Sequence, residues 1–75
     1  MPTPSLTLAR RLYAKKHGIY LGAAYASVTA CHSNGTRYFA RVWDAFEVVH
    51  EETETYARTE QAALRKLCRA LGWRP

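Results

Sequence analysis

The chain has 75 residues, a hydrophobic fraction of 48% and a formal net charge of +5 at pH 7. A fold of this length buries only roughly 60% of the surface that its unfolded chain exposes, which leaves room for one small core and none for a deep catalytic cleft. The composition argues against disorder, and the absence of any apolar run near about 18 residues argues against a membrane span.

The N-terminus and the cysteines predict a cytoplasmic protein. The first residues carry their basic side chains after the apolar ones and contain no long apolar region, which argues against a secretory signal. The two cysteines, Cys31 and Cys68, are too few for a disulfide framework. We therefore expect reduced thiols, and one domain over residues 1–75.

The charges are divided by segment. Six basic residues and no acidic residue precede Asp44, all six acidic residues lie within residues 44–60, and four basic residues follow. An acidic middle between two basic ends steers partners more than it sets the fold.

The first predicted element is a helix over residues 4–17. Thr3 is its expected N-cap, Pro4 suits the first turn because a missing N–H costs nothing there, and Gly18 is the expected C-cap. The buried stripe consists of Leu8, Ala9, Leu12 and Tyr13, with Leu6 at its edge. The basic residues that point mostly away from it are Arg10, Arg11, Lys15 and Lys16.

A β-hairpin is predicted next, because Asn34-Gly35 is the strongest short-range signal for a two-residue turn. Such a turn places Cys31 opposite Tyr38 and defines two faces. One face carries Tyr25, Ser27, Thr29, Cys31, Tyr38, Ala40 and Val42. The other carries Ala24, Ala26, Val28, Ala30, Phe39 and Trp43, together with Arg37 and Arg41. We expect the first face to be the core face, because a helix over the second would bury Arg41 without an evident partner.

A third strand is predicted over residues 46–57, after a short connection at Asp44 and Ala45. Apolar and acidic residues alternate at its start, which suits a sheet with one wet face. The acidic residues also protect a free sheet edge from self-association.

The closing helix is predicted to begin after Thr59 as N-cap and to end at Gly72, with Trp73 folding back on the helix. Its buried stripe consists of Ala63, Leu64, Leu67, Cys68 and Leu71. The order of elements predicts an α+β domain: two layers, built as helix, three-stranded antiparallel sheet, helix.

The patterns of a catalytic or metal site are missing from the sequence. The histidines His17, His32 and His50 have no metal-binding spacing, and Cys31 and His32 are neighbours that point to opposite faces of a strand. Cys68 lies on the apolar stripe, which predicts a buried, inert thiol. We expect no enzymatic activity, no catalytic residue, no metal and no cofactor.

The order helix, three strands, helix resembles the double-stranded-RNA-binding domain over nearly the whole chain, by topology. That resemblance implies a lysine cluster at the start of the second helix, where it meets the phosphates of a duplex. The matching stretch here is "TEQAALRK", in which Glu60 and Gln61 occupy the first turn and the basic residues come later. A carboxylate at that place repels a phosphate. His32 is a loose match to the family's histidine in the middle loop.

A second resemblance is one of style. A compact chain with a hairpin, an acidic third strand and an ending such as "TEQAALRKLCRALGW" resembles the small orphan proteins of phages and mobile elements, among them anti-CRISPR proteins. The resemblance implies a non-enzymatic protein that occupies a surface of a host nucleoprotein complex.

Two basic surfaces are candidates for contact with a partner: the outer face of the first helix, and a strand face on which arginines alternate with aromatic residues. The second can stack bases and meet phosphates, and Trp and Arg are also enriched in protein-binding hot spots. The same strand residues could form an ordinary solvent face, with arginines lying over the aromatic rings. The predicted partner-binding residues are Arg10, Arg11, Lys15, Lys16, Arg37, Phe39, Arg41 and Trp43.

Two functional hypotheses follow. The leading one is a phage or mobile-element protein that inhibits a host defence complex of the CRISPR-Cas kind, either through these residues or through an acidic strand that imitates nucleic-acid charge. The alternative is a small basic nucleic-acid-binding protein. Under either hypothesis the expected partner is a host protein, a nucleoprotein complex or a nucleic acid and not a membrane, and the expected state is a monomer or small homodimer.

Overall fold

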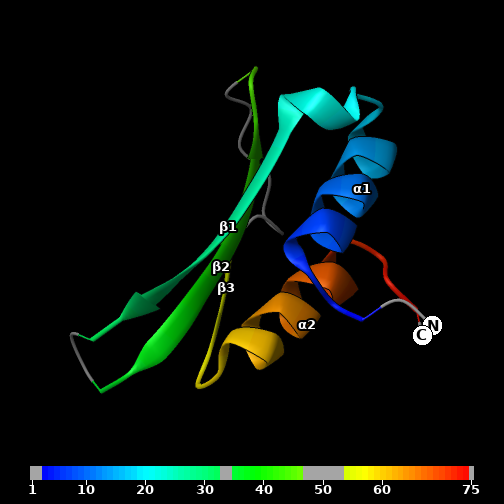
Figure 1. The fold of residues 1–75 in the computed structure, drawn as a ribbon. Coiled ribbons are helices and arrows are strands. Elements are labelled where there is room, and N and C mark those ends of the chain that lie inside the picture. Colours follow the sequence, from blue (N-terminus) through cyan, green and yellow to red (C-terminus); the bar gives the residue numbers. More distant parts are fainter. Residues whose placement is uncertain (1–2, 33–34, 47–53, 75) are drawn as a thin grey trace.

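A computed structural model describes residues 3–32, 35–46 and 54–74. The elements in chain order are α1 (Leu6–His17), the 3-10 turn η1 (Leu21–Ala23), β1 (Ala24–Cys31), β2 (Arg37–Asp44), β3 (Glu54–Ala57) and α2 (Glu60–Ala70). The three strands pair antiparallel in the order β1-β2-β3, and both helices lie on one side of this sheet (Figure 1). The predicted α+β fold of helix, three antiparallel strands and helix is confirmed. No helix in the described ranges has the length and apolar character needed to cross a membrane.

Helix α1 begins two residues later than predicted. Ser5, and not Thr3, is the N-cap, since its hydroxyl accepts the N–H of Leu8 at 3.1 Å. Pro4 lies before the helix and is buried, and its carbonyl accepts a hydrogen bond from Gln61 of α2 at 3.1 Å. The predicted C-cap is confirmed, because Gly18 takes the left-handed conformation at φ 64°.

Helix α2 has the two ends that the sequence predicts. The Thr59 hydroxyl accepts the N–H of Ala62 at 3.1 Å. At the other end Gly72 has φ 97°, and the N–H of Trp73 donates to the Cys68 carbonyl at 2.9 Å, which is the long bond of a Schellman motif. The predicted stripe is fully confirmed as buried: Ala63, Leu64, Leu67, Cys68 and Leu71.

The register of the hairpin differs by one residue from the prediction. Cys31 is the Cα partner of Arg37, and not of Tyr38, so an odd number of residues separates the two strands. The turn predicted at Asn34-Gly35 includes a residue outside the described part of the chain. A one-residue slip moves a whole strand to the other face, so the predicted facing is right for β2 and wrong for β1.

Alternation along the strands shows why this register is favoured. The helix-covered face takes Ala24, Ala26 and Val28 from β1 beside Ala40 and Val42 from β2. In the predicted register the polar side chains of β1 would have been buried instead. The arginines of β2 stay exposed, as expected for charged side chains that are costly to bury.

The third strand is shorter than predicted. It runs over Glu54–Ala57, and Ala45 and Phe46 form a turn after β2. Residues 47–53 lie outside the described part, so the strand predicted over residues 46–57 is compared with the structure only at Phe46 and at residues 54–57. Asp44 is not a connection but the last residue of β2, where it pairs with Ala24.

A buried carboxylate ends β2 and fastens it to α1. Asp44 is only 4% exposed, and its two oxygens accept hydrogen bonds from the Tyr13 hydroxyl at 2.6 Å and from the Phe46 N–H at 2.8 Å. The second bond is that of an Asx turn, in which a side chain accepts the N–H two residues on. Tyr13 is itself fully buried in the core between α1 and the sheet.

Candidate functional site

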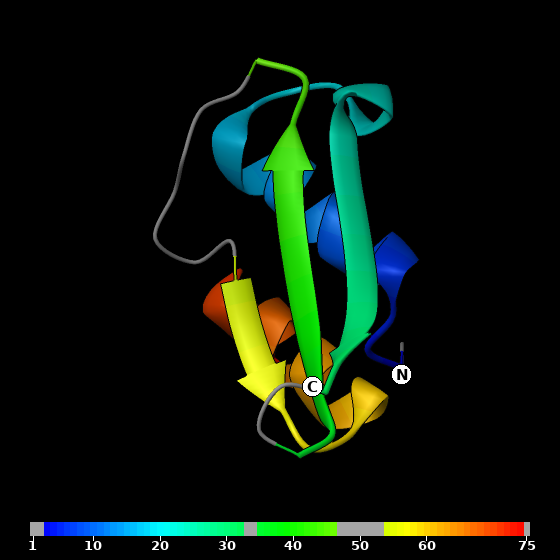
Figure 2. The same ribbon diagram turned by 90° about the vertical axis from the view of Figure 1, so that its left-hand side faces the viewer.

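The side of the sheet away from the helices is uncovered in the described part of the molecule, and we call it the open face. Figure 2 looks onto it, with the strands in front of both helices. Its residues are Tyr25, Ser27, Thr29, Cys31, Arg37, Phe39, Arg41, Trp43, Glu54 and Tyr56. All four strand residues predicted to contact a partner are among them.

Two stacked aromatic pairs dominate the open face. Tyr25 of β1 is the direct cross-strand partner of Trp43, with ring centroids 5.8 Å apart and the ring planes 26° from parallel. Phe39 is the direct partner of Tyr56 on β3, at 4.9 Å and 25°. Tyr25 and Tyr56 remain 44% and 52% exposed. The rings therefore support one another while keeping a large apolar area in water.

Arginines alternate with the aromatic residues along β2. The guanidinium carbon of Arg41 lies 4.8 Å from the ring centroid of Trp43, in a cation–π contact that holds the charge on the open face. Arg41 comes between Phe39 and Trp43, and Arg37 is exposed at the start of the strand. Among its described residues the face carries one acid, Glu54, which is the Cα partner of Arg41 on β3.

The helix residues predicted to bind a partner lie in the other layer of the molecule. Arg10 is half-buried and donates to the carbonyl of Ala24 at 2.7 Å and to that of Leu21 at 3.0 Å, so it fastens α1 to the turn before β1. Arg11, Lys15 and Lys16 are exposed on α1. The eight predicted residues are thus divided between the open face and α1, and they do not form one continuous surface.

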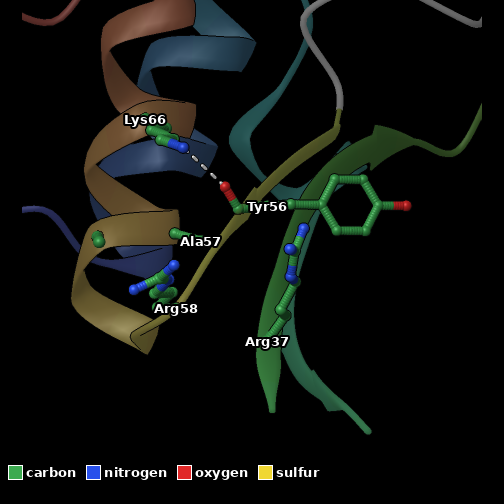
Figure 3. Close-up of a pocket in the computed structure, with 6 residues that line it drawn as sticks. Arg37, Tyr56, Ala57, Arg58 and Lys66 are labelled. Atoms are coloured by element: carbon green, nitrogen blue, oxygen red, sulfur yellow. Dashed lines mark hydrogen bonds between the residues drawn. The ribbon is translucent and has the colours of Figure 1, made fainter. Parts of the chain in front are cut away.

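An open hollow of about 410 Å³ lies at the edge of the sheet, where β3 meets α2. It is lined by Arg37, Tyr56, Ala57, Arg58, Ala62 and Lys66. Figure 3 shows Arg37 and the Tyr56 ring on one side of β3 and Arg58 and Lys66 on the side of α2. The Lys66 ammonium donates to the Tyr56 carbonyl at 2.9 Å, so the hollow adjoins the aromatic pair that contains Tyr56.

The start of α2 serves the fold. The Gln61 side chain donates to the Pro4 carbonyl, a contact that joins α2 to the entrance of α1. Glu60 is exposed in the first turn, where a carboxylate suits the positive end of the helix. Where the resemblance to the double-stranded-RNA-binding domain implies a lysine cluster, the first turn of α2 therefore carries an acid and a glutamine that contacts the segment before α1.

The remaining candidate groups are dispersed. The His17 ring packs against Tyr13 with centroids 4.5 Å apart, and His32 Nδ1 lies 3.4 Å from the Thr36 hydroxyl. His50 is outside the described residues. Burial raises the pKa of the Cys68 thiol, which fits the inert cysteine that the sequence predicts. Within the described ranges no three His, Cys, Asp or Glu side chains are grouped as metal ligands would be.

Sequence reasoning missed four residues of this surface: Tyr25, Tyr56, Arg58 and Lys66. Tyr25 was recoverable, because the apolar row Ala24, Ala26, Val28 alternates with polar neighbours and marks the buried side of β1. Arg58 and Lys66 come near Tyr56 only when α2 packs beside β3, and no spacing in the sequence indicates that.

The open face can hold flat, apolar ligand groups against its rings and anionic groups at its arginines. No family model, curated protein or solved structure matches the chain.

Proposed function

We propose that the protein is a non-enzymatic binding domain that takes a single-stranded nucleic acid on its open face, in the cytoplasm. The observation that carries the proposal is the pair of stacked aromatic rows, Tyr25–Trp43 and Phe39–Tyr56, on a sheet face that no described element covers. A net charge of +5 adds the long-range attraction that a polyanion needs.

The physical basis is stacking combined with phosphate contact. Each base that stacks on an aromatic side chain contributes about 1–3 kcal/mol, and the contact tolerates any sequence because every base has a π face. Phe39 and Trp43 are four residues apart on β2, which is about 13 Å along a strand. Arg41 lies between the two rows, within reach of a phosphate that links bases on either side.

The same arrangement favours a single strand over a duplex. The bases of a duplex are stacked on each other and cannot lie on protein rings, and duplex RNA is bound mainly through its backbone and shape. The place where the double-stranded-RNA-binding domain carries its lysines holds Glu60 and Gln61 here. Weak or absent duplex binding is therefore part of the proposal.

The test is fluorescence anisotropy with a labelled oligothymidine of about 12 nucleotides, within the site sizes known for single-strand binders. Tyr25→Ala removes one ring of the open face and is expected to weaken binding about 5- to 150-fold. Tyr20→Ala is the matched control, because Tyr20 is an equally large ring, 81% exposed, that lies before η1 and off the open face. It is expected to bind as the wild type does.

A salt series completes the test. If Arg37 and Arg41 each meet one phosphate, log K falls with log salt with a slope of about −1.4, and more steeply if further cations take part. Equal losses from Tyr25→Ala and Tyr20→Ala, or wild-type protein that does not bind the oligonucleotide at low salt, would overturn the proposal.

A second candidate is the phage or mobile-element inhibitor of a host defence complex, which would act as a monomer or small homodimer. The observation that favours it is the identity of the groups on the open face: Trp43, Tyr25 and Arg41 belong to the residue types that dominate protein-binding hot spots. In that case the open face occupies a protein surface of the complex.

A pull-down from bacterial lysate separates the two candidates. The inhibitor is expected to recover a stoichiometric protein after nuclease treatment, and to lose it in the Tyr25→Ala variant. Recovery of nucleic acid alone, with no protein after nuclease, supports the first candidate and counts against the second.

A further inference from the structure

The hollow beside β3 gathers positive charge, since Arg37, Arg58 and Lys66 all line it. Arg37 precedes Tyr38, the Cα partner of Ala57, and Arg58 follows Ala57, so both arginines come to the same end of the β2–β3 ladder. Figure 3 shows Arg58 and Lys66 together on the α2 side of β3, with Arg37 on the other side. None of the described residues that line the hollow is acidic, so this positive charge is not neutralised within it.

The cationic side chains of the hollow have N–H donors that can bind a ligand. A lysine ammonium has three N–H donors, and the Tyr56 carbonyl takes one of those of Lys66. The guanidinium groups of Arg37 and Arg58 are exposed, and a guanidinium matches the geometry of a phosphate. The Tyr56 backbone is thus held by a cation while the Tyr56 ring lies on the open face against Phe39.

We infer that this hollow is a phosphate-binding subsite, which holds the backbone phosphate next to the base that stacks on Tyr56. The inference rests on the proposed function. It adds the position of one bound phosphate and the direction in which the nucleic-acid strand leaves the open face. The strand leaves the open face across the edge strand β3, past Arg37, and its phosphate meets Arg58 and Lys66. At edge strand β3 the residues of the open face and of α2 line one hollow (Figure 3).

Charge-removing variants test the subsite. Arg58→Gln and Lys66→Gln are each expected to reduce the magnitude of the salt slope for oligothymidine by about 0.7, and to weaken binding about fivefold at 0.1 M salt. The matched controls are Arg65→Gln and Arg69→Gln, which remove the same charge from exposed positions of the same helix outside the hollow. They are expected to keep the wild-type slope. Arg58→Gln is the cleaner test, since Lys66→Gln also removes the bond to Tyr56.

A chemical probe locates the phosphate. In a set of oligothymidines, one linkage at a time is replaced by an uncharged methylphosphonate. Every oligonucleotide in the set carries its label at the same position. One linkage is expected to weaken binding to wild-type protein and to the Arg65→Gln control, and to have no further effect on Arg58→Gln.

The outcomes separate this inference from the function on which it rests. If Tyr25→Ala abolishes binding while Arg58→Gln and Lys66→Gln behave as the two controls do, the subsite is wrong and the open-face proposal stands. If wild-type protein binds no oligonucleotide, both are wrong. A uniform loss for all four variants would mean a nonspecific charge effect and would also overturn the subsite.

Discussion

The two faces of the sheet differ in their apolar side chains. The covered face has Ala24, Ala40 and Val42 fully buried, and the half-buried Tyr38 packs against the same core. The open face presents Phe39 and Trp43 on the same strand, together with the tyrosines of β1 and β3. Four aromatic rings of the sheet thus lie on the open face, while Tyr13 of α1 lies in the core.

The difference shows that the rings on the open face are not there to build the core. The large buried groups come from the helices, chiefly Tyr13, Leu64 and Leu67, and alanines in the sheet let these helices approach closely. Small proteins gain most of their stability from buried apolar area, so exposed rings represent area that the fold leaves unused. Exposed apolar surface often marks an interaction site, and the proposed binding function rests on this reading of the open face.

The covered side should show the largest effect on stability. Leu67→Ala removes a fully buried side chain and leaves a cavity, so the free energy of unfolding is expected to fall by about 2–5 kcal/mol in urea denaturation. Leu21→Ala is the control, because Leu21 is 41% exposed, and it should cost less than about 1 kcal/mol. Similar losses for the two variants would contradict the assigned core.

The open side should show the opposite behaviour: a large effect on binding with the fold retained. The double variant Arg41→Gln/Trp43→Ala removes a stacking ring and the cation above it, so oligothymidine binding is expected to fall at least tenfold in anisotropy titrations. Its circular dichroism spectrum at 25 °C should remain that of the wild type. An unfolded double variant would show that the open face is part of the core after all.

The buried link between the layers gives the next effect. Tyr13→Phe removes one donor from the Asp44 carboxylate, and a buried acceptor that loses a donor is expected to destabilise the fold by about 1–3 kcal/mol. Thermal denaturation measures the loss. Tyr38→Phe serves as control, since Tyr38 packs against the same core as Tyr13 but is only half-buried. If Tyr13→Phe leaves the stability unchanged, the hydrogen bond between Tyr13 and Asp44 contributes nothing to it.

A smaller change in binding affinity has opposite signs for the two candidate partners. Glu54→Gln removes the carboxylate opposite Arg41, and a cross-strand charge of this kind is worth about 0.2–1 kcal/mol. Nucleic acid should therefore bind a few-fold more tightly, whereas a basic protein surface should bind less tightly. Glu60→Gln makes the same charge change off the open face, at the start of α2, and should leave both affinities near those of the wild type.

The smallest effect is confined to alkaline pH. Burial raises the pKa of the Cys68 thiol in the folded protein, and a hydrogen bond from the Ser5 backbone only partly offsets it. The unfolded chain therefore loses this proton first, so the thiol's contribution is complete below its ordinary pKa of about 8.5 and is lost as pH rises through the folded value. Denaturation at pH 7 and pH 10 should show a larger loss for wild type than for Cys68→Ala. Equal pH dependence would contradict a buried thiol.

Local signals explain which predictions about the helices and strands were correct. The Thr59 cap, the Gly18 and Gly72 ends and the stripe of α2 depend on residues within one or two turns of each other, so the sequence contains all the information. The start of α1 was misplaced because Thr3 and Ser5 are both acceptable caps. The choice falls to Ser5, with the Pro4 carbonyl accepting the Gln61 side chain from the far end of the chain.

Sequence patterns were enough to predict the order of the helices and strands, the fold class and the exposure of Arg37 and Arg41, whereas Phe39 and Trp43 are half-buried on the same face. Those features follow from periodicity and from the difficulty of burying a charge. Which residues of β1 share that face follows from how the strands pair in the packed fold, because register is a relation between two strands and a shift of one residue inverts the answer. The packed fold also brings Tyr56, Arg58 and Lys66 together at the edge of the sheet, since the distance between α2 and β3 is set by packing that no segment specifies alone.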